Sequence, residues 1–123
     1  MKVLIADDDR VLTRLATAGL KTRGWQVEVA HDAMQALMFA MKPPHPDVIA
    51  LDIGMPGGSG MAVLKKLQQS SRTSQIPVVV VSGSITEADE AMVLGLGAAA
   101  FLRKPVDAQM LHETLSRVAG ETG

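Results

Sequence analysis

Four apolar segments of this chain each end in side chains that can bind a cation or a phosphoryl group. In chain order these side chains are Asp7, Asp8, Asp9, Asp52, Ser82 and Lys104. If the segments are neighbouring strands of a parallel sheet, their carboxyl ends meet at one edge, where such sheets bind ligands. Carboxylate oxygens suit a hard divalent cation, a carboxylate can act as a nucleophile, and hydroxyl and ammonium groups can donate to phosphoryl oxygens. The sequence therefore predicts a crevice suited to phosphoryl transfer.

Each of these residues also has an ordinary structural explanation. Acidic residues at a strand–helix junction often cap the helix, an Asp after a strand often forms a turn, and a single Ser or Lys usually lies in a turn or at the surface. Asp9 alone could cap the following helix, which leaves Asp7 and Asp8 without that explanation. The ordinary explanations would all have to coincide at adjacent strand ends, so we favour the chemical interpretation.

Composition limits the classes of function. With 123 residues, 47% of them hydrophobic, the chain is long enough for one domain with a core, and we expect residues 1–123 to form it. The net charge of −1, with scattered Lys and Arg, gives no sign of a nucleic-acid or membrane surface. The absence of cysteine excludes thiol catalysis and Cys-ligated metals. No apolar run approaches ~18 residues and no signal peptide is recognisable, so we expect a cytoplasmic protein.

The elements that position these side chains follow from an alternation of short apolar runs with amphipathic segments. Strands are predicted at residues 2–6, 26–30, 48–51, 78–81 and 99–103. The predicted helix caps are Asp9, Asp32, Ser59, Thr86 and Asp107. The helices that follow them extend to about residues 23, 42, 69, 96 and 119. Gly24 stands where a glycine would end the first helix.

Five strands alternating with five helices predict a doubly wound α/β fold with a parallel sheet. Residues 26–30 alternate apolar with polar side chains, which is typical of an edge strand. Residues 48–51 and 78–81 are continuously apolar and should be central, buried on both faces. The strand order 2-1-3-4-5 is consistent with this pattern, because it places the least apolar strand at an edge.

Several other side chains are assigned to packing rather than to chemistry. The predicted buried face of the first helix consists of Leu12, Leu15, Ala16 and Leu20. A second set, predicted as helical core and not as a cofactor site, consists of Met34, Leu37, Met38 and Met41. Trp25 is expected to pack against the core. The histidines, expected at the surface or in turns because their spacing suits no metal, are His31, His45 and His112.

Taken together, these residues make the chain resemble the receiver domain of bacterial two-component response regulators over essentially its whole length. The matching positions are Asp7, Asp8, Asp52, Ser82, Phe101, Lys104 and Pro105. Each motif alone is weak, but their joint order along one alternating chain of strands and helices is specific. The resemblance implies a flavodoxin-like receiver fold with the strand order 2-1-3-4-5, and a role in phosphorelay signal transduction.

The resemblance implies that Asp52 is the phosphoacceptor. The phosphoryl group would come from a sensor histidine kinase, a histidine phosphotransfer protein or a small acyl phosphate. Mg²⁺ would be the cofactor, bound directly by Asp8, Asp52 and the backbone carbonyl of Gly54, with Asp7 acting through water. Lys104 would pair with Asp52 at rest and with a phosphoryl oxygen afterwards.

The resemblance also implies how the signal leaves the site. Ser82 would donate its hydroxyl to a phosphoryl oxygen, and Phe101 would turn inward into the space that Ser82 vacates. This would change the face formed by the helix after Thr86, the strand at 99–103 and the last helix, where a downstream protein would bind. The Lys104–Pro105 bond would be cis. The chain would be a signalling switch, with enzymatic activity limited to its own phosphorylation and dephosphorylation, and without direct contact to nucleic acid or membrane.

Other interpretations stay open. The chain could be a receiver module excised from a hybrid histidine kinase or a multidomain regulator. It could be a small Mg-dependent phosphohydrolase with an Asp nucleophile, although residues 52–54 read Asp-Ile-Gly and lack the second Asp of the common Asp-x-Asp pattern. A flavodoxin-type nucleotide binder would need a Gly-rich or hydroxyl-rich phosphate loop where this chain has Asp7, Asp8 and Asp9. A receiver that cannot be phosphorylated is disfavoured because every chemical position is filled.

Overall fold

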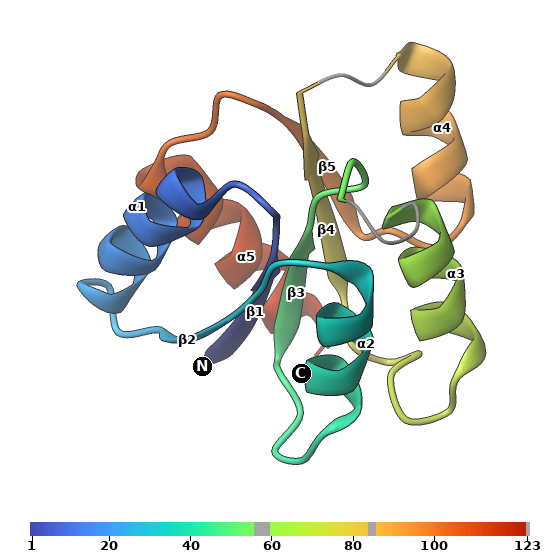
Figure 1. Cartoon of the computed structure of the whole chain (residues 1–123), viewed down its shortest axis with the longest axis horizontal. Coiled ribbons are helices and arrows are strands. Elements are labelled where there is room, and N and C mark those ends of the chain that lie inside the picture. Colours follow the sequence, from blue (N-terminus) through green and yellow to red (C-terminus); the bar gives the residue numbers. More distant parts are fainter. Residues whose placement is uncertain (56–59, 84–85, 123) are drawn as a thin grey trace.

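The structure, a computed structural model, describes residues 1–55, 60–83 and 86–122. Its strands are β1 Lys2–Ala6, β2 Gln26–Ala30, β3 Val48–Leu51, β4 Val78–Ser82 and β5 Ala100–Arg103. They form one parallel sheet in the order β2-β1-β3-β4-β5 (Figure 1). The predicted strand order and the doubly wound, flavodoxin-like α/β fold are confirmed.

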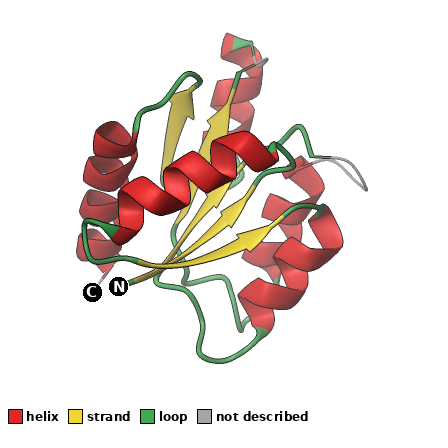
Figure 2. Ribbon diagram, turned by 60° about the vertical axis from the view of Figure 1, so that its left-hand side comes forward, coloured by secondary structure: helices red, strands yellow, loops and turns green. Residues whose placement is uncertain are grey.

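Helices cover both faces of the sheet (Figure 2). Their bounds are α1 Arg10–Lys21, α2 Ala33–Met41, α3 Gly60–Gln69, α4 Glu87–Gly95 and α5 Ala108–Thr122. Helices α1 and α5 pack on one face, and α2, α3 and α4 pack on the other (Figure 1). The two resulting cores sandwich β3, whose Ile49 belongs to one core and whose Val48 belongs to the other. Burial on both sides therefore explains the continuously apolar sequence of this strand.

Capping fixes where the helices begin. The Asp9 carboxylate accepts hydrogen bonds from the backbone N–H groups of Val11 at 3.1 Å and Leu12 at 3.0 Å, so α1 starts directly after the acidic segment. The side chains that cap in this way are Asp9, Asp32, Thr86 and Asp107. The expected cap Ser59 lies outside the described residues. Gly24 has φ of 89°, a conformation that glycine adopts at little cost, and it closes the turn after α1.

The predicted buried face of α1 is wrong at Leu15, whose side chain is 70% exposed. Leu20 is fully buried as expected. Gly19 lies so close to Ala108 that a Cβ at this position would overlap the Ala108 Cβ. Helix α5 begins at Ala108, which lies opposite Gly19 of α1. Leu15 lies one turn before Gly19 on the same face of α1, so it extends beyond the start of α5 and is not covered by it. The apolar face of α1 therefore extends beyond the first residue of α5, the helix that covers the rest of this face.

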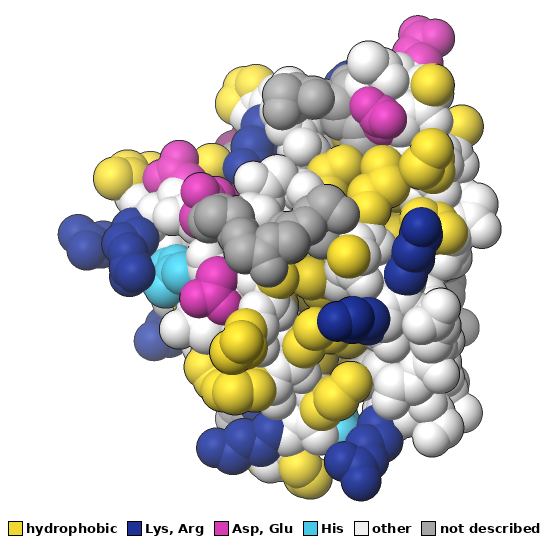
Figure 3. Space-filling view, turned by 45° about the vertical axis from the view of Figure 1, so that its right-hand side comes forward, with side chains coloured by type: hydrophobic (Ala, Val, Ile, Leu, Met, Phe, Trp, Pro, Cys, Tyr) yellow, Lys and Arg dark blue, Asp and Glu magenta, His cyan; other side chains and the backbone are white. Residues whose placement is uncertain are grey.

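The predicted core set on α2 is also wrong in part. Met34 and Met38 are 73% and 57% exposed, and the buried stripe consists of Ala33, Ala36 and Ala40. Both stripes have helical spacing, so periodicity alone could not choose between them. The alanines face the sheet because their small side chains allow a close approach, which leaves the methionines outside. Apolar side chains are accordingly visible on the surface of this side of the molecule (Figure 3).

The packing prediction for Trp25 is confirmed. Its side chain is 6% exposed, and its Nε1–H donates to Nδ1 of His112 on α5 at 2.9 Å. The two rings meet edge to face at an interplanar angle of 84°. This contact joins the turn between α1 and β2 to the first half of α5. Within the part of the chain that the structure describes, no helix has both the length and the apolar character needed to cross a membrane.

Candidate functional site

Strand pairing brings the acidic residues to one level at the carboxyl ends of β1 and β3. Ala6 pairs in register with Leu51, so Asp7 and Asp52 follow side by side. The backbone N–H of Asp52 donates to the carbonyl of Ala6 at 2.8 Å, which extends the ladder into the site. Carboxylate oxygens of Asp7, Asp8 and Asp52 all lie within 4.8 Å of one another. The structure thus gathers the three predicted acidic side chains into one cluster.

The three carboxylates differ in their exposure to solvent. Asp7 and Asp52 are 4% and 8% exposed, because both follow buried strands. Asp8 is exposed, since it stands between the end of β1 and the cap of α1. The cluster is therefore open on the side of Asp8 and closed on the side of Asp7.

Lys104 joins the cluster from the end of β5. Its ammonium lies 2.8 Å from Oδ2 of Asp7 and 3.3 Å from Oδ2 of Asp52. The backbone N–H of Lys104 donates to the carbonyl of Ser82, which holds this segment against β4. The Lys104–Pro105 peptide bond is cis. The expected pairing with Asp52 is present, and the shorter contact is with Asp7, which the sequence did not indicate.

Burial and neighbouring charges shift the pKa values of both Asp7 and Lys104. Burial raises the pKa of Asp7, although hydrogen bonds from the Lys104 ammonium and the Asp9 backbone act in the opposite direction. Burial works to lower the pKa of Lys104, but its hydrogen bond to Asp7 and the charges of Asp7 and Asp52 outweigh this effect and raise the pKa. Lys104 thus remains a cation beside the acidic cluster at neutral pH.

The Asp52 carboxylate is held in one orientation from two sides. The backbone N–H of Gly54 donates to its Oδ1 at 2.9 Å, and Lys104 donates to its Oδ2. A Cβ at Gly54 would lie 3.4 Å from Oδ1, in ordinary van der Waals contact, so any side chain at this position would start directly beside the carboxylate. At Gly60 a Cβ would overlap Cα of Ile53 and lie 2.6 Å from the carbonyl oxygen of Asp52. The start of α3 thus depends on glycine because it lies directly against the backbone of Asp52 and Ile53.

Ser82 and Phe101 lie on the same face of neighbouring strands. Ser82 is 4% exposed at the end of β4, two residues after Val80. Phe101 pairs in register with Val80 and packs, half-buried, against the same core. The guanidinium carbon of Arg103 lies over the Phe101 ring, 5.4 Å from its centroid. The two predicted switch residues are therefore diagonal neighbours with no strand between them.

Sequence reasoning missed an apolar pocket of about 420 Å³ that Lys104 helps to line. Its wall on α1 includes Val11 and Leu15, and its other wall includes Pro105 and Val106. Val11 and Leu15 are 69% and 70% exposed although they are apolar and one turn apart. An exposed apolar pair directly after an acidic segment was the available signal, but periodicity alone assigned Leu15 to the core.

Comparison with known proteins identifies relatives over nearly the whole chain. The response regulator receiver domain family matches residues 3–116. Protein PilH of Pseudomonas aeruginosa is 34% identical over 117 residues, which cover 95% of this chain and 96% of PilH. Transcriptional regulatory protein CpxR of Klebsiella pneumoniae is 41% identical over 104 residues, 85% of this chain but 43% of CpxR. The chain thus spans less than half the length of CpxR.

The fold agrees with these sequence relationships. The crystal structure of a CheY-like response regulator receiver domain protein from Methanospirillum hungatei superposes with a TM-score of 0.90 at 25% identity. The match covers 98% of this chain and 94% of that one. The family match, the sheet order and the acidic cluster lead to one conclusion. The chain belongs to the response regulator receiver domain family of two-component systems, whose general function is that of a phosphorylation switch.

Proposed function

We propose that this domain accepts a phosphoryl group on Asp52 from a sensor histidine kinase or a histidine phosphotransfer protein. The observation that carries the proposal is the orientation of the Asp52 carboxylate, which Gly54 and Lys104 hold from two sides beside two further carboxylates. An oxygen of Asp52 attacks phosphorus, the bond from phosphorus to the donor imidazole nitrogen breaks, and the imidazole keeps the electron pair. The product is an acyl phosphate on Asp52.

The donor set fits Mg²⁺. Carboxylate and carbonyl oxygens are the ligands that this cation prefers, and the cluster brings three carboxylates within 4.8 Å of one another. Asp8, Asp52 and the carbonyl of Gly54 would hold the ion, and Asp7 would act through water because its Oδ2 is engaged by Lys104. A bound divalent cation reduces the repulsion between an anionic nucleophile and an anionic phosphoryl group.

Lys104 and Ser82 act on the oxygens of the transferred group. The Lys104 ammonium already contacts Oδ2 of Asp52 at 3.3 Å, so it is positioned to donate to a phosphoryl oxygen attached there. Ser82 ends the adjacent strand and can donate its hydroxyl to a second oxygen. The new phosphoryl group is then held by charge-assisted hydrogen bonds that are absent before transfer.

The apolar pocket between α1 and the segment after β5 supports a docking role for the donor protein. It is lined in part by Lys104, which contacts Asp52, and it includes the exposed side chains of Val11 and Leu15. A partner helix with apolar side chains can cover these residues and bring its phosphohistidine over Asp52. Small acyl phosphates need no such contact, so the two kinds of donor should differ in their dependence on this pocket.

The output surface proposed for this domain is the face formed by α4, β5 and α5. Movement of Ser82 toward the phosphoryl group leaves space that Phe101 can enter from the neighbouring strand, because both lie on one face of the sheet. Withdrawal of Phe101 changes the surface beside Arg103, and a downstream protein can bind to the changed face. Residues 1–123 act as one cytoplasmic receiver module, either as an independent regulator or within a hybrid kinase or multidomain regulator.

The test is phosphorylation with acetyl phosphate and Mg²⁺, followed by intact mass and peptide mapping. The wild-type chain should gain one phosphoryl group on Asp52, and Asp52→Asn should gain none. Asp47→Asn, which changes an exposed carboxylate at the opposite end of β3, is the matched control and should behave as wild type. Turnover of acetyl phosphate without any adduct would instead indicate a phosphohydrolase.

A further inference from the structure

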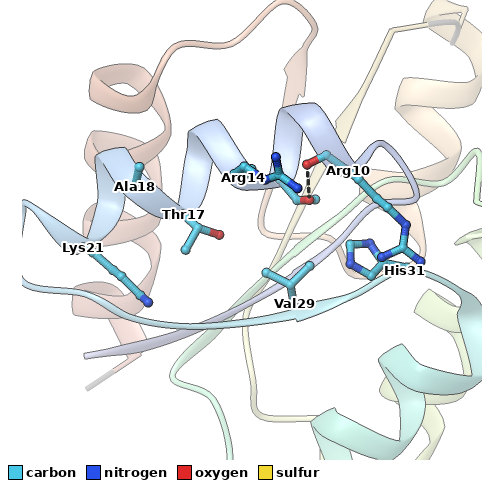
Figure 4. Close-up of a pocket in the computed structure, with 8 residues that line it drawn as sticks. Arg10, Arg14, Thr17, Ala18, Lys21, Val29 and His31 are labelled. Carbon is cyan, nitrogen blue, oxygen red and sulfur yellow. Dashed lines mark hydrogen bonds between the residues drawn. The ribbon is translucent and has the colours of Figure 1, made fainter.

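A groove of about 430 Å³ lies between α1 and the edge strand β2 (Figure 4). Its walls carry Arg10, Arg14 and Lys21 from α1 and His31 from the end of β2, and none of its lining residues is acidic. Within the described residues, these arginines and this lysine form no ion pair, whereas Lys2, Arg103 and Lys104 do. The groove of a chain with net charge −1 thus brings together three cations that have no ion-pair partner among the described residues.

The spacing of these cations suits an elongated ligand. Arg10, Arg14 and Lys21 lie at positions i, i+4 and i+11 of one helix and share a face. At 1.5 Å per residue, the first two are about 6 Å apart along the helix and the outer two about 16 Å. A single small anion cannot contact all of them, so the ligand carries several negative charges along its length.

The groove also contains an unpaired buried hydroxyl. Oγ1 of Thr17 is buried and has no hydrogen-bond partner among the described residues. In Figure 4 the side chain of Thr17 points from α1 toward Val29, across the groove between Arg14 and Lys21. Buried polar atoms without a partner are rare in native proteins because they lose their hydrogen bonds to water. Because this oxygen is closed off from solvent in the free chain, a bound ligand supplies the missing partner only when Thr17 rotates about its Cα–Cβ bond and turns the hydroxyl into the groove.

The floor of the groove is an open strand edge. The N–H of Gln26 donates to Met1, and the carbonyl of Ala30 accepts from Asp7, so residues 26, 28 and 30 direct their backbone groups toward β1. In a parallel pair the alternate residues point the other way, so Val27 and Val29 direct their N–H and C=O groups outward. Strand β2 is at the edge of the sheet and pairs with β1 alone among the described strands. This row of donors and acceptors is a template for another extended backbone.

We propose that the groove binds an acidic, extended peptide segment of a partner protein, which adds to the sheet beside β2 and places alternate Asp or Glu side chains against Arg10, Arg14 and Lys21. Alternate side chains of a strand are about 6.6 Å apart, close to the helical spacing of Arg10 and Arg14. A peptide fits better than a nucleic acid, because a phosphodiester backbone has no alternating N–H and C=O groups to match β2. The groove and the pocket beside Lys104 use different faces of α1, so both can be occupied together.

The test uses a fluorescein-labelled peptide of about eight alternating Val and Glu residues, long enough to span the groove. Its binding to the full chain is followed by fluorescence anisotropy. A second peptide with the same sequence carries N-methyl groups on alternate amides, which preserves its charge but blocks strand pairing. We expect the methylated peptide to bind about tenfold more weakly, corresponding to about 1.4 kcal/mol. Equal binding of both peptides, or no binding of either, would overturn the proposal.

Charge variants test the location of the site. Arg14→Glu/Lys21→Glu should weaken binding of the unmodified peptide by about tenfold or more. Lys65→Glu/Lys66→Glu makes the same change in net charge on exposed residues of α3, on the other face of the sheet, and should retain binding. Circular dichroism and urea unfolding should show that both variants fold. An equal loss in both would mean that only overall charge matters, and the groove would be excluded.

Two further measurements bear on the ligand class. Thr17→Val should keep the stability of the free chain, because the lost hydroxyl has no partner, and should weaken peptide binding severalfold. Amide NMR shifts on peptide addition should be largest at Val27 and Val29. Unchanged peptide binding by Thr17→Val together with shifts outside β2 would refute the proposal. Tighter binding of a thymidine oligonucleotide of similar length, lost in Arg14→Glu/Lys21→Glu, would replace the peptide with a nucleic acid.

Discussion

Gly60→Ala should destabilise the domain and displace Asp52, although alanine usually stabilises a helix relative to glycine. Gly60 is the first residue of α3, and its N–H donates to the carbonyl of Ile53 at 2.9 Å. A Cβ at Gly60 would overlap Cα of Ile53 and lie 2.6 Å from the carbonyl oxygen of Asp52. Both contacts are to backbone, so no side-chain rotation can relieve them.

The size of the effect follows from two opposing contributions. Inserting a methyl group into a closely packed site destabilises by about 1–3 kcal/mol, and the backbone contacts place Gly60 at the upper end of that range. Replacing glycine by alanine in a helix contributes up to about 1 kcal/mol in the other direction. The expected net loss is therefore about 2 kcal/mol in the free energy of unfolding, or a fall of about 1 M in the urea midpoint at an m-value of about 2 kcal/mol/M.

Urea unfolding followed by circular dichroism measures this loss, and intact mass measures the rate of phosphorylation by acetyl phosphate. Gly95→Ala is the matched control, because Gly95 is the last residue of α4 and a Cβ there would meet nothing within 4 Å. The control should be stabilised by up to about 1 kcal/mol and phosphorylated at the wild-type rate. If Gly60→Ala were as stable as Gly95→Ala and equally reactive, the close approach at Asp52 would not be required.

Three further outcomes are expected. Because the folded-state pKa of Lys104 is raised above 10.5, its stabilising contribution should be fully present below pH 10.5 and lost as pH rises through the folded-state value. The stability difference between wild type and Lys104→Met, measured with EDTA, should therefore shrink above pH 10.5; a constant difference up to about pH 12 would contradict this. Asp8→Ala should lose Mg²⁺ binding by calorimetry and phosphorylation by acetyl phosphate, whereas undiminished Mg²⁺ binding would remove Asp8 from the site. Ser82→Ala should still accept a phosphoryl group at Asp52 but should give altered NMR shifts at Phe101 and along α4 with beryllofluoride; wild-type shifts would rule out the proposed coupling.

The elements of the fold were accessible from sequence because their information is local, whereas the order of the strands rested partly on the family resemblance. Each strand is a short apolar run, each cap is a short polar residue at the start of an amphipathic segment, and residues 26–30 carry the polar alternation of an edge. The site was accessible for a related reason: Asp7, Asp52, Ser82 and Lys104 each end a strand, and a parallel sheet brings such ends together. No knowledge of side-chain packing was needed for either inference.

The features that sequence did not predict depend on how elements pack against one another. Met34 and Ala33 lie on stripes of equal periodicity, and only the close approach of α2 to the sheet decides which is buried. Leu15 is exposed because α5 begins one turn too late to cover it. The shorter pairing of Lys104 with Asp7 depends on the reach of a long side chain across the cluster. Periodicity carries no information about these distances.

The position of Trp25 gives the domain a built-in optical reporter that is separate from its chemistry. The chain has a single tryptophan, which directly precedes β2 at the amino-terminal edge of the sheet. Asp52 follows β3 at the opposite, carboxyl edge. A strand of five residues separates these two edges of the sheet by about 16 Å. Fluorescence from Trp25 therefore senses its hydrogen bond to His112 and the junction of α1 with α5. A change in emission on phosphorylation would show that the junction responds at a distance, and constant emission would show that the response stays at the strand ends.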